Sequence, residues 1–134
     1  MAQPNSVSDA LEALLEAPSE DALEAADKVD SDLETEESPD LLELLERRHA
    51  LAVLRAVATT PDSRRFSELE EEIGAAPSTL SARLSEFTEA GLLERESYDE
   101  MPPRVEYRPT EAATALAPLF TYLRLWESRY GDDA

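Results

Sequence analysis

Arginines and short hydroxyl side chains gathered between residues 63 and 110 are the groups in this sequence best suited to chemistry. A guanidinium can fork onto a phosphate or onto the edge of a guanine, and small hydroxyl groups permit close approach to a nucleic acid. Each arginine could instead form a surface ion pair worth about 0–1 kcal/mol. The candidate contacts to double-stranded DNA are Arg64, Arg65, Ser78, Thr79, Ser81, Arg83, Arg104 and Arg108.

Other kinds of chemistry have little support in the sequence. It contains no cysteine and one histidine, His49, so disulfides, thiolate-zinc sites and thiol redox sensing are excluded. There is no Ser/His/Asp arrangement, phosphate-binding glycine loop or metal-ligand spacing. The carboxylate run over residues 70–72 is interpreted as a solvated helix face. We therefore expect no enzyme, no cofactor and no metal site.

A helix expected over residues 77–91 would carry the hydroxyl groups. Proline suits its first position and glycine its end. Its apolar residues repeat at i, i+4 and i+7 and should point inward: Leu80, Leu84 and Phe87. The opposite edge then presents Ser78, Thr79, Ser81 and Arg83, although Arg83 is also within reach of Glu86 three residues later.

Two strands should follow this helix as a hairpin. They are expected over residues 92–97 and 104–108, on either side of a turn that contains Met101-Pro102-Pro103. Arg104 and Arg108 should share a face, because alternate residues of a strand point to the same side. An arginine at such a tip can enter a minor groove, where negative potential is concentrated.

Two helices and a short strand should precede the helix over 77–91. Ser38-Pro39-Asp40 has the composition of a helix start, and that helix should run to about Thr59. Residues 64–66 can form a short strand. Ser67 and Glu70 match a capping box that opens the next helix, and Gly74 fits its C-terminal cap.

A last helix, capped by Thr110 and kinked at Pro118, should extend to about Tyr130. It has more apolar surface than one small core needs, so one face should meet the first helix of its own subunit and another a second subunit. The residues expected at the interface of a homodimer are Leu116, Leu119, Phe120, Leu123 and Trp126.

This order of elements is that of a winged helix-turn-helix. We expect a mainly α fold with a small β-wing and with extended N- and C-terminal helices. The helix over 77–91 would lie in the major groove of DNA, and the hairpin would lie over the backbone beside it.

The formal net charge of −19 opposes nucleic-acid binding unless the cations gather on one face. Residues 1–39 hold twelve acidic residues and one base, a net −11, and residues 40–134 hold 19 acidic residues and eleven arginines, a net −8. Excess carboxylate with a single lysine, Lys28, is typical of proteins from halophilic archaea, where molar salt screens self-repulsion. An ordinary acidic interaction domain is the alternative.

The change in charge divides the chain into an acidic extension, residues 1–39, and a DNA-binding domain, residues 40–134. Leucines at helical spacing before Pro18 and a similar pattern after it predict two short helices, or a helical arm that docks on a protein partner. A frayed acidic tail is an equal alternative. No apolar run has the length of a membrane span and no leader is evident, so a cytoplasmic location is expected.

Several segments resemble the HxlR-type winged-helix transcriptional regulators. They are Arg64-Arg65-Phe66-Ser67-Glu68-Leu69, Leu80-Ser81-Ala82-Arg83-Leu84, Glu89-Ala90-Gly91-Leu92-Leu93-Glu94-Arg95, Pro102-Pro103-Arg104-Val105-Glu106-Tyr107 and Thr110-Glu111. The resemblance covers roughly residues 45–130. It implies a homodimer on operator DNA, with Arg83 in the groove and Arg104 on the backbone. It does not extend to the family's frequent N-terminal sensing cysteine, since this chain has none.

Two functions therefore stay open. One is a sequence-specific DNA-binding transcriptional regulator that acts as a homodimer. The other is a winged-helix module for protein–protein contact in a transcription or replication assembly, which the net −8 of residues 40–134 favours. A positive stripe along Arg64, Arg83 and Arg104 would favour DNA, whereas neutralisation of these arginines by carboxylates would favour a protein partner.

Overall fold

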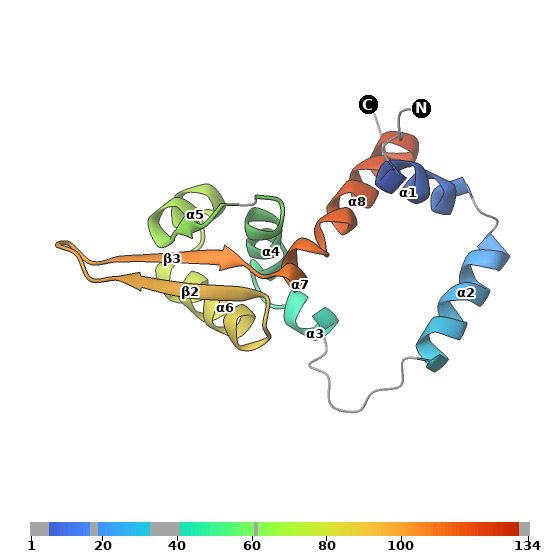
Figure 1. Cartoon of the computed structure of the whole chain (residues 1–134). Helices are drawn as coiled ribbons and strands as arrows, with labels where there is room; N and C mark the ends of the chain where they lie inside the picture. Colours follow the sequence, from blue (N-terminus) through green and yellow to red (C-terminus); the bar gives the residue numbers. More distant parts are fainter. Residues whose placement is uncertain (1–5, 17–18, 33–40, 61, 132–134) are drawn as a thin grey trace. The chain divides into compact units, whose positions relative to one another are not determined.

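A computed structural model describes residues 6–16, 19–32, 41–60 and 62–131 (Figure 1). The chain forms two compact units. One unit is Pro39–Ala117, and the other joins Met1–Ser38 to Pro118–Ala134. The division into an extension and a DNA-binding domain at residue 39 stays a prediction.

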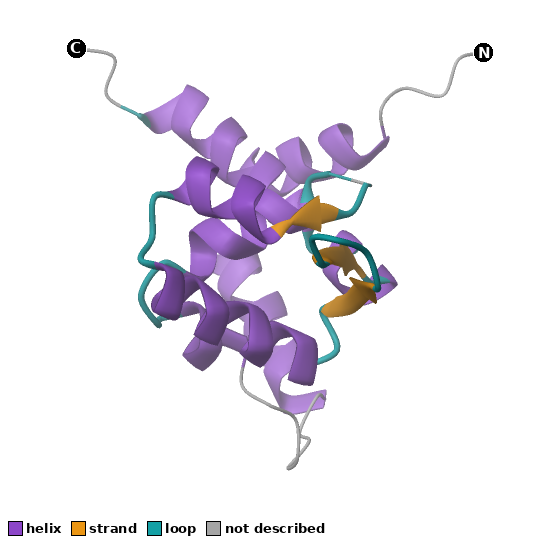
Figure 2. Ribbon diagram, turned by 90° about the vertical axis from the view of Figure 1, so that its left-hand side faces the viewer, coloured by secondary structure: helices purple, strands orange, loops and turns teal. Residues whose placement is uncertain are grey.

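The unit Pro39–Ala117 is a winged helix-turn-helix, as predicted. Its elements are α3 (Leu41–Leu45), α4 (Ala50–Ala58), β1 (Arg64–Arg65), α5 (Phe66–Ile73), α6 (Pro77–Glu89), β2 (Leu93–Tyr98), β3 (Arg104–Pro109) and α7 (Glu111–Thr114). The antiparallel sheet has the order β1-β3-β2. The β2–β3 hairpin extends beyond the helices in Figure 1, and Figure 2 looks toward its tip.

The core of this unit lies where three helices meet the sheet. The largest fully buried side chains come from α4, α5 and α6, and they include Leu54, Leu69, Leu80, Leu84 and Phe87. Burial of each such side chain contributes about 1.5–3 kcal/mol. The predicted inward face of the helix over 77–91 is therefore confirmed.

Helix α6 begins and ends where the sequence predicts. Pro77 occupies the first turn, and after Ala90 the chain passes through Gly91 at φ 84°. The Gly91 N–H donates to the Thr88 carbonyl at 3.1 Å, and the Leu92 N–H donates to the Phe87 carbonyl at 2.9 Å. These two bonds form a Schellman motif, which satisfies carbonyls that the helix end leaves open. Strands β2 and β3 follow within one residue of their predicted bounds.

The prediction of one continuous helix up to Thr59 was wrong. Helix α3 ends at Leu45, and α4 begins at Ala50 after His49, which has a φ of 65°. Residues 46–49 offer no apolar side chain for burial, and an ion pair from Arg47 to Glu86 and a hydrogen bond from Arg83 to the Arg48 carbonyl connect their turn to α6 instead. Ser38-Pro39-Asp40 lies outside the described residues.

The predicted capping box of Ser67 and Glu70 was also wrong. Helix α5 begins at Phe66, and the Glu68 carboxylate accepts a hydrogen bond from the Arg65 backbone N–H at 3.1 Å. The start shifts because β1 pairs Arg65 with Glu106 of β3 and so fixes where the chain turns. The predicted cap at Gly74, which has a φ of 76°, is confirmed.

The predicted last helix is broken rather than kinked. Thr110 caps α7 as expected, because its hydroxyl oxygen accepts from the Ala113 N–H at 3.3 Å. Helix α7 then ends at Thr114, and a separate helix, α8 (Ala117–Tyr130), follows. Pro118 has no N–H to donate to the Thr114 carbonyl, which explains why the helix does not continue through this point.

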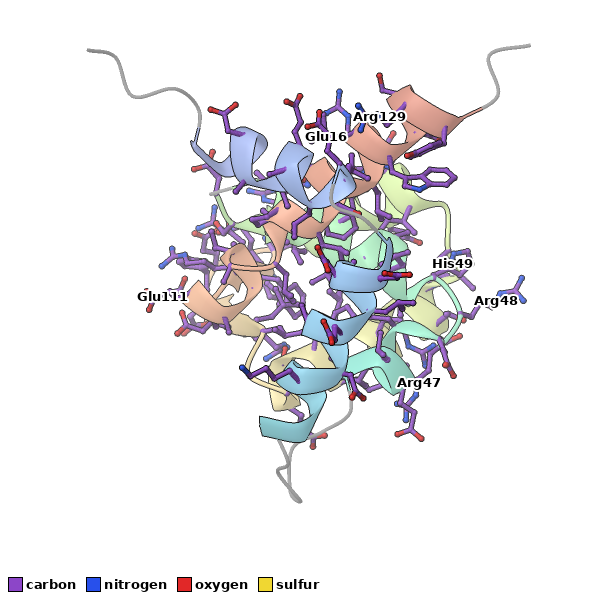
Figure 3. All side chains as sticks on the ribbon, turned by 90° about the vertical axis from the view of Figure 1, so that its right-hand side faces the viewer. Glu16, Arg47, Arg48, His49, Glu111 and Arg129 are labelled. Carbon is purple, nitrogen blue, oxygen red and sulfur yellow. The ribbon has the colours of Figure 1, made fainter. Side chains whose placement is uncertain are left out.

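The other unit contains α1 (Ser6–Glu16), α2 (Ser19–Asp32) and α8. Residues 6–32 thus contain two short helices, and a role for them as an arm that docks on a protein partner stays a prediction. Arg129 of α8 lies 3.5 Å from the Glu16 carboxylate of α1 (Figure 3). None of the described helices combines the length and apolar character that crossing a membrane requires.

Candidate nucleic-acid interface

The outward edge of α6 carries a row of unpartnered hydroxyl groups. Ser78 and Ser81 are exposed, and Thr79 is half-buried. Within the described part of the chain, none of these three side chains makes a hydrogen bond to another protein group. The structure thus brings three of the predicted contact residues together at the N-terminal turns of one helix.

Arg83 of α6 differs from these hydroxyl groups in its burial, since its side chain is only 14% exposed. Its Nη1 donates to the Arg48 carbonyl at 3.2 Å, and its Nη2 donates to Glu86 at 3.3 Å. Glu86 also lies 3.0 Å from Nη1 of Arg47. Figure 3 shows Arg47, Arg48 and His49 together in the turn before α4. Arg83 therefore ties α6 to this turn.

Arg64 has a similar inward role. Its Nη1 donates to the Ala56 carbonyl of α4 at 3.0 Å, and its Nη2 pairs with Glu72 of α5. Its Nε lies 3.8 Å from Glu68. The guanidinium therefore connects β1 to two helices, and little of it reaches solvent.

Three other predicted contacts, Arg65, Arg104 and Arg108, share the outer face of the wing. The register places Arg104 opposite Tyr98 and Arg65 opposite Glu106, so the expected alternation holds. The guanidinium carbon of Arg104 lies 4.1 Å from the centre of the Tyr98 ring. A carboxylate lies beside each arginine: Glu100 and Glu106 beside Arg104, Glu106 beside Arg65, and Glu96 beside Arg108.

The Tyr98 phenol is part of the same face. Its hydroxyl donates to Glu96 at 3.1 Å. This hydrogen bond raises the pKa of Tyr98 above its ordinary value of 10.0, desolvation and the charges of Glu96 and Glu106 raise it further, and Arg104 opposes the shift. The phenol is therefore neutral at physiological pH. No group of three or more acidic or histidine side chains able to hold a metal ion occurs among the described residues.

Four arginines outside the predicted contacts are exposed and form no ion pair within the described ranges: Arg48, Arg55, Arg95 and Arg124. Of these, Arg95 lies in the wing and Arg48 in the turn that contacts α6. Arg95 alternates with Glu94 and Glu96 in β2, so it points to the same side as the buried Leu93, which is the side on which α6 packs. The alternation of side chains along the strand could have shown that Arg95 points to the face opposite these glutamates. The sequence contains no comparable indication for Arg48, because the turn that contains it was predicted to be part of a helix.

The predicted dimer residues divide between the two units. Leu116 lies in the connection between α7 and α8. The other four, Leu119, Phe120, Leu123 and Trp126, lie on α8 with spacings that put them on one side of a helix. Leu123 and Trp126 are exposed over nearly half of their surfaces, and the Trp126 ring lies 5.5 Å from that of Tyr130.

The solved structures that this chain resembles include two transcriptional regulators. The chain aligns with the reduced form of the transcriptional regulator YodB from Bacillus subtilis at a TM-score of 0.59 and 26% identity, over 70% of this chain and 91% of YodB. It aligns with a protein assigned to the MarR family of transcriptional regulators from Enterococcus faecalis V583 at a TM-score of 0.57 and 30% identity, over 66% of this chain and 80% of that one.

Sequence comparison gives a consistent result. An uncharacterised HTH-type transcriptional regulator from Mycobacterium bovis is 38% identical over 89 residues, which is 66% of this chain and 55% of that protein. The chain thus spans about half the length of this curated relative. The HxlR-like helix-turn-helix family matches residues 44–134, which include the whole wing and α6. The chain therefore belongs to the HxlR-like helix-turn-helix family.

Proposed function

We propose that this protein is a sequence-specific DNA-binding transcriptional regulator that acts as a homodimer. The observation that carries the proposal is the outward edge of α6, where Ser78 and Ser81 are exposed and have no partner among the described residues. In a helix-turn-helix protein the second helix of the motif enters the major groove and reads bases near its N-terminus. The relatives named as HTH-type transcriptional regulators support the same function.

The predicted contact residues divide into three roles. Ser78, Thr79 and Ser81 would meet base edges or phosphates at the helix start, where the helix dipole favours negative charge. Arg65, Arg104 and Arg108 would contact the backbone from the wing. The remaining two, Arg64 and Arg83, are hydrogen-bonded to backbone carbonyls. We propose that they hold the helices in position and do not contact DNA.

Homodimerisation through α8 is part of the proposal. Leu123 and Trp126 leave apolar surface exposed, and contiguous surface of this kind marks association sites. A two-fold dimer would place two copies of α6 about one helical turn of DNA apart. The predicted operator is therefore a pair of inverted half-sites.

A protein-binding module is the alternative that paired arginines favour, and Arg64, Arg83 and Arg104 are all paired with carboxylates. Membership of a family whose relatives are named as regulators favours DNA over that alternative. A halophilic source, a cytoplasmic location and a protein partner for residues 1–39 stay predictions.

The test is selection of DNA by the full chain from a library of random duplexes, at low salt and at molar salt. We expect an enriched motif with two-fold symmetry. Ser81→Glu should abolish selection, because it places a carboxylate against DNA. Ala112→Glu, which adds the same charge at an exposed position of α7, should not. Failure to enrich any motif at either salt concentration would contradict the proposal.

A further inference from the structure

The outer face of the wing carries equal numbers of paired cations and carboxylates. Arg65, Arg104 and Arg108 are matched by three glutamates, and each arginine lies within 4.0 Å of at least one of them. Glu96 and Glu106 face each other directly across β2 and β3. Like charges in this arrangement repel unless cations flank them. With Glu94, which lies opposite Arg108 on the same face and forms no ion pair among the described residues, the face has no net positive charge, although a contact to DNA phosphates requires positive charge.

Arg104 differs from the inward arginines in how it is held. Arg64 and Arg83 donate hydrogen bonds to backbone carbonyls. Arg104 makes no hydrogen bond within the described residues: its Nη2 lies 3.2 Å and its Nε 3.5 Å from carboxylate oxygens without hydrogen-bond alignment, and its buried Nε is unsatisfied. The donors on its two Nη atoms form no hydrogen bond among the described residues and are therefore available to a better acceptor, whereas the buried Nε is not.

The two carboxylates beside Arg104 are not equivalent. Glu106 is 15% exposed, accepts a hydrogen bond from the Ser63 hydroxyl at 2.7 Å and also faces Arg65. Glu100 is 51% exposed, lies in the turn of the hairpin, and has Arg104 as its one ion-pair partner in the described part of the chain. Glu106 is thus fixed in the sheet, whereas Glu100 can leave Arg104 at small cost.

An open recess of about 420 Å³ adjoins this pair. It is lined by Arg65, Glu100, Arg104 and the two prolines of the turn, among others. Both guanidinium groups line the recess, and its volume is sufficient for a phosphodiester group. Of the two carboxylates beside Arg104, Glu100 is the more exposed one and lines the recess.

We propose that Glu100 masks Arg104 and that a DNA backbone phosphate takes its place in this recess, while Glu106 keeps the arginine positioned. This inference rests on the proposed function. A carboxylate that must be displaced weakens binding by the strength of its ion pair. For an exposed pair that is a factor of up to about five in affinity, and less at high salt.

The experiment is a double-mutant cycle on DNA affinity, measured by fluorescence anisotropy with the motif that the wild-type chain selects. The variants are Glu100→Gln, Arg104→Ala and both together. The control is Glu94→Gln, which removes the same charge from an exposed β2 residue that forms no ion pair in the described ranges. Circular dichroism checks that each variant is folded.

We expect Glu100→Gln to tighten binding about threefold more than Glu94→Gln does. In the Arg104→Ala background the advantage of Glu100→Gln should disappear. Equal effects of the two glutamine variants, tightening that persists without Arg104, or weaker binding by Glu100→Gln would each overturn the proposal. If Arg104→Ala leaves affinity unchanged, the wing contact itself is wrong, and if no motif is selected, the proposed function fails.

Discussion

The guanidinium of Arg83, on α6, donates a hydrogen bond to the backbone carbonyl of Arg48, 3.2 Å away in the turn before α4. Glu86 completes the link, since it contacts both Arg83 and Arg47. The helix that presents the serine edge is therefore fixed to the turn by charged groups as well as by its apolar core. This arrangement makes Arg83 a determinant of stability.

Arg83→Ala should lower the free energy of unfolding by about 1.5–3 kcal/mol, because it leaves the Arg48 carbonyl without its donor and the half-buried Glu86 carboxylate with Arg47 as its one remaining ion-pair partner in the described part of the chain. Arg83→Lys should recover only part of this, since an ammonium cannot reproduce the fork. Urea unfolding measures the change. Arg124→Ala, at an exposed position with no ion pair among the described residues, is the control and should change stability by less than about 0.5 kcal/mol. Equal losses in Arg83→Ala and Arg124→Ala would contradict this role.

The elements that the sequence predicted well are those whose signals are local. Pro77, the apolar residues of α6 and Gly91 lie within 15 residues of one another, and each acts through short-range geometry. The break at His49 was missed because it depends on Arg83, whose hydrogen bond to Arg48 spans 35 residues of sequence. The sequence around residue 49 contains no signal of that contact.

The candidate site was likewise predictable only where local sequence signals determine it. Alternation placed Arg104 and Arg108 on one face of the wing, and the register agrees. The pairing of Arg65 with Glu106 was not predictable, because it depends on which strand lies beside β3. The inward orientation of Arg64 was not predictable for the same kind of reason. Its hydrogen bond to the Ala56 carbonyl depends on how α4 packs against β1.

Gly91→Ala should destabilise the protein by about 1–2 kcal/mol, because the left-handed conformation is strained for a residue with a Cβ. A Cβ at Gly91 would meet no atom within 4 Å, so the cost comes from the backbone alone. Asparagine tolerates this conformation better, and Gly91→Asn should cost less. Thermal unfolding measures both. Gly74→Ala is a matched case with φ of 76° and equally open space, and a large difference between the two alanine variants would refute the explanation.

Arg95→Ala should weaken DNA binding uniformly across sequences and reduce the slope of log affinity against log salt by about 1, as expected for a phosphate contact. The reason is that Arg95 lies in the wing, on the side of β2 that faces α6, is exposed and has no carboxylate to displace among the described residues. Titrations at several salt concentrations measure the slope. Arg55→Ala, an exposed unpaired arginine on α4, serves as the control, and an identical change in both slopes would indicate a general charge effect.

Tyr98 should ionise at a pH above 10.0, because its hydroxyl donates to the Glu96 carboxylate. A raised pKa means that the folded state favours the neutral phenol. The corresponding stability is present in full below pH 10 and is lost as the pH rises through the folded-state pKa. The difference between the ultraviolet titrations of the wild type and Tyr98→Phe isolates this group. A midpoint at or below the ordinary value would contradict the assignment.

Leu123→Glu and Trp126→Glu should convert the proposed dimer to monomers, raising its dissociation constant roughly a hundredfold, because an unpaired carboxylate would be buried twice at a two-fold interface. Sedimentation velocity measures the oligomeric state. Arg124→Glu lies between these positions in sequence and is exposed, so it separates the effect of a buried charge from that of added negative charge on α8. If Arg124→Glu dissociates the protein as fully as the other two variants, net repulsion is the cause. If all three variants leave the dimer intact, subunits associate through a surface other than this side of α8.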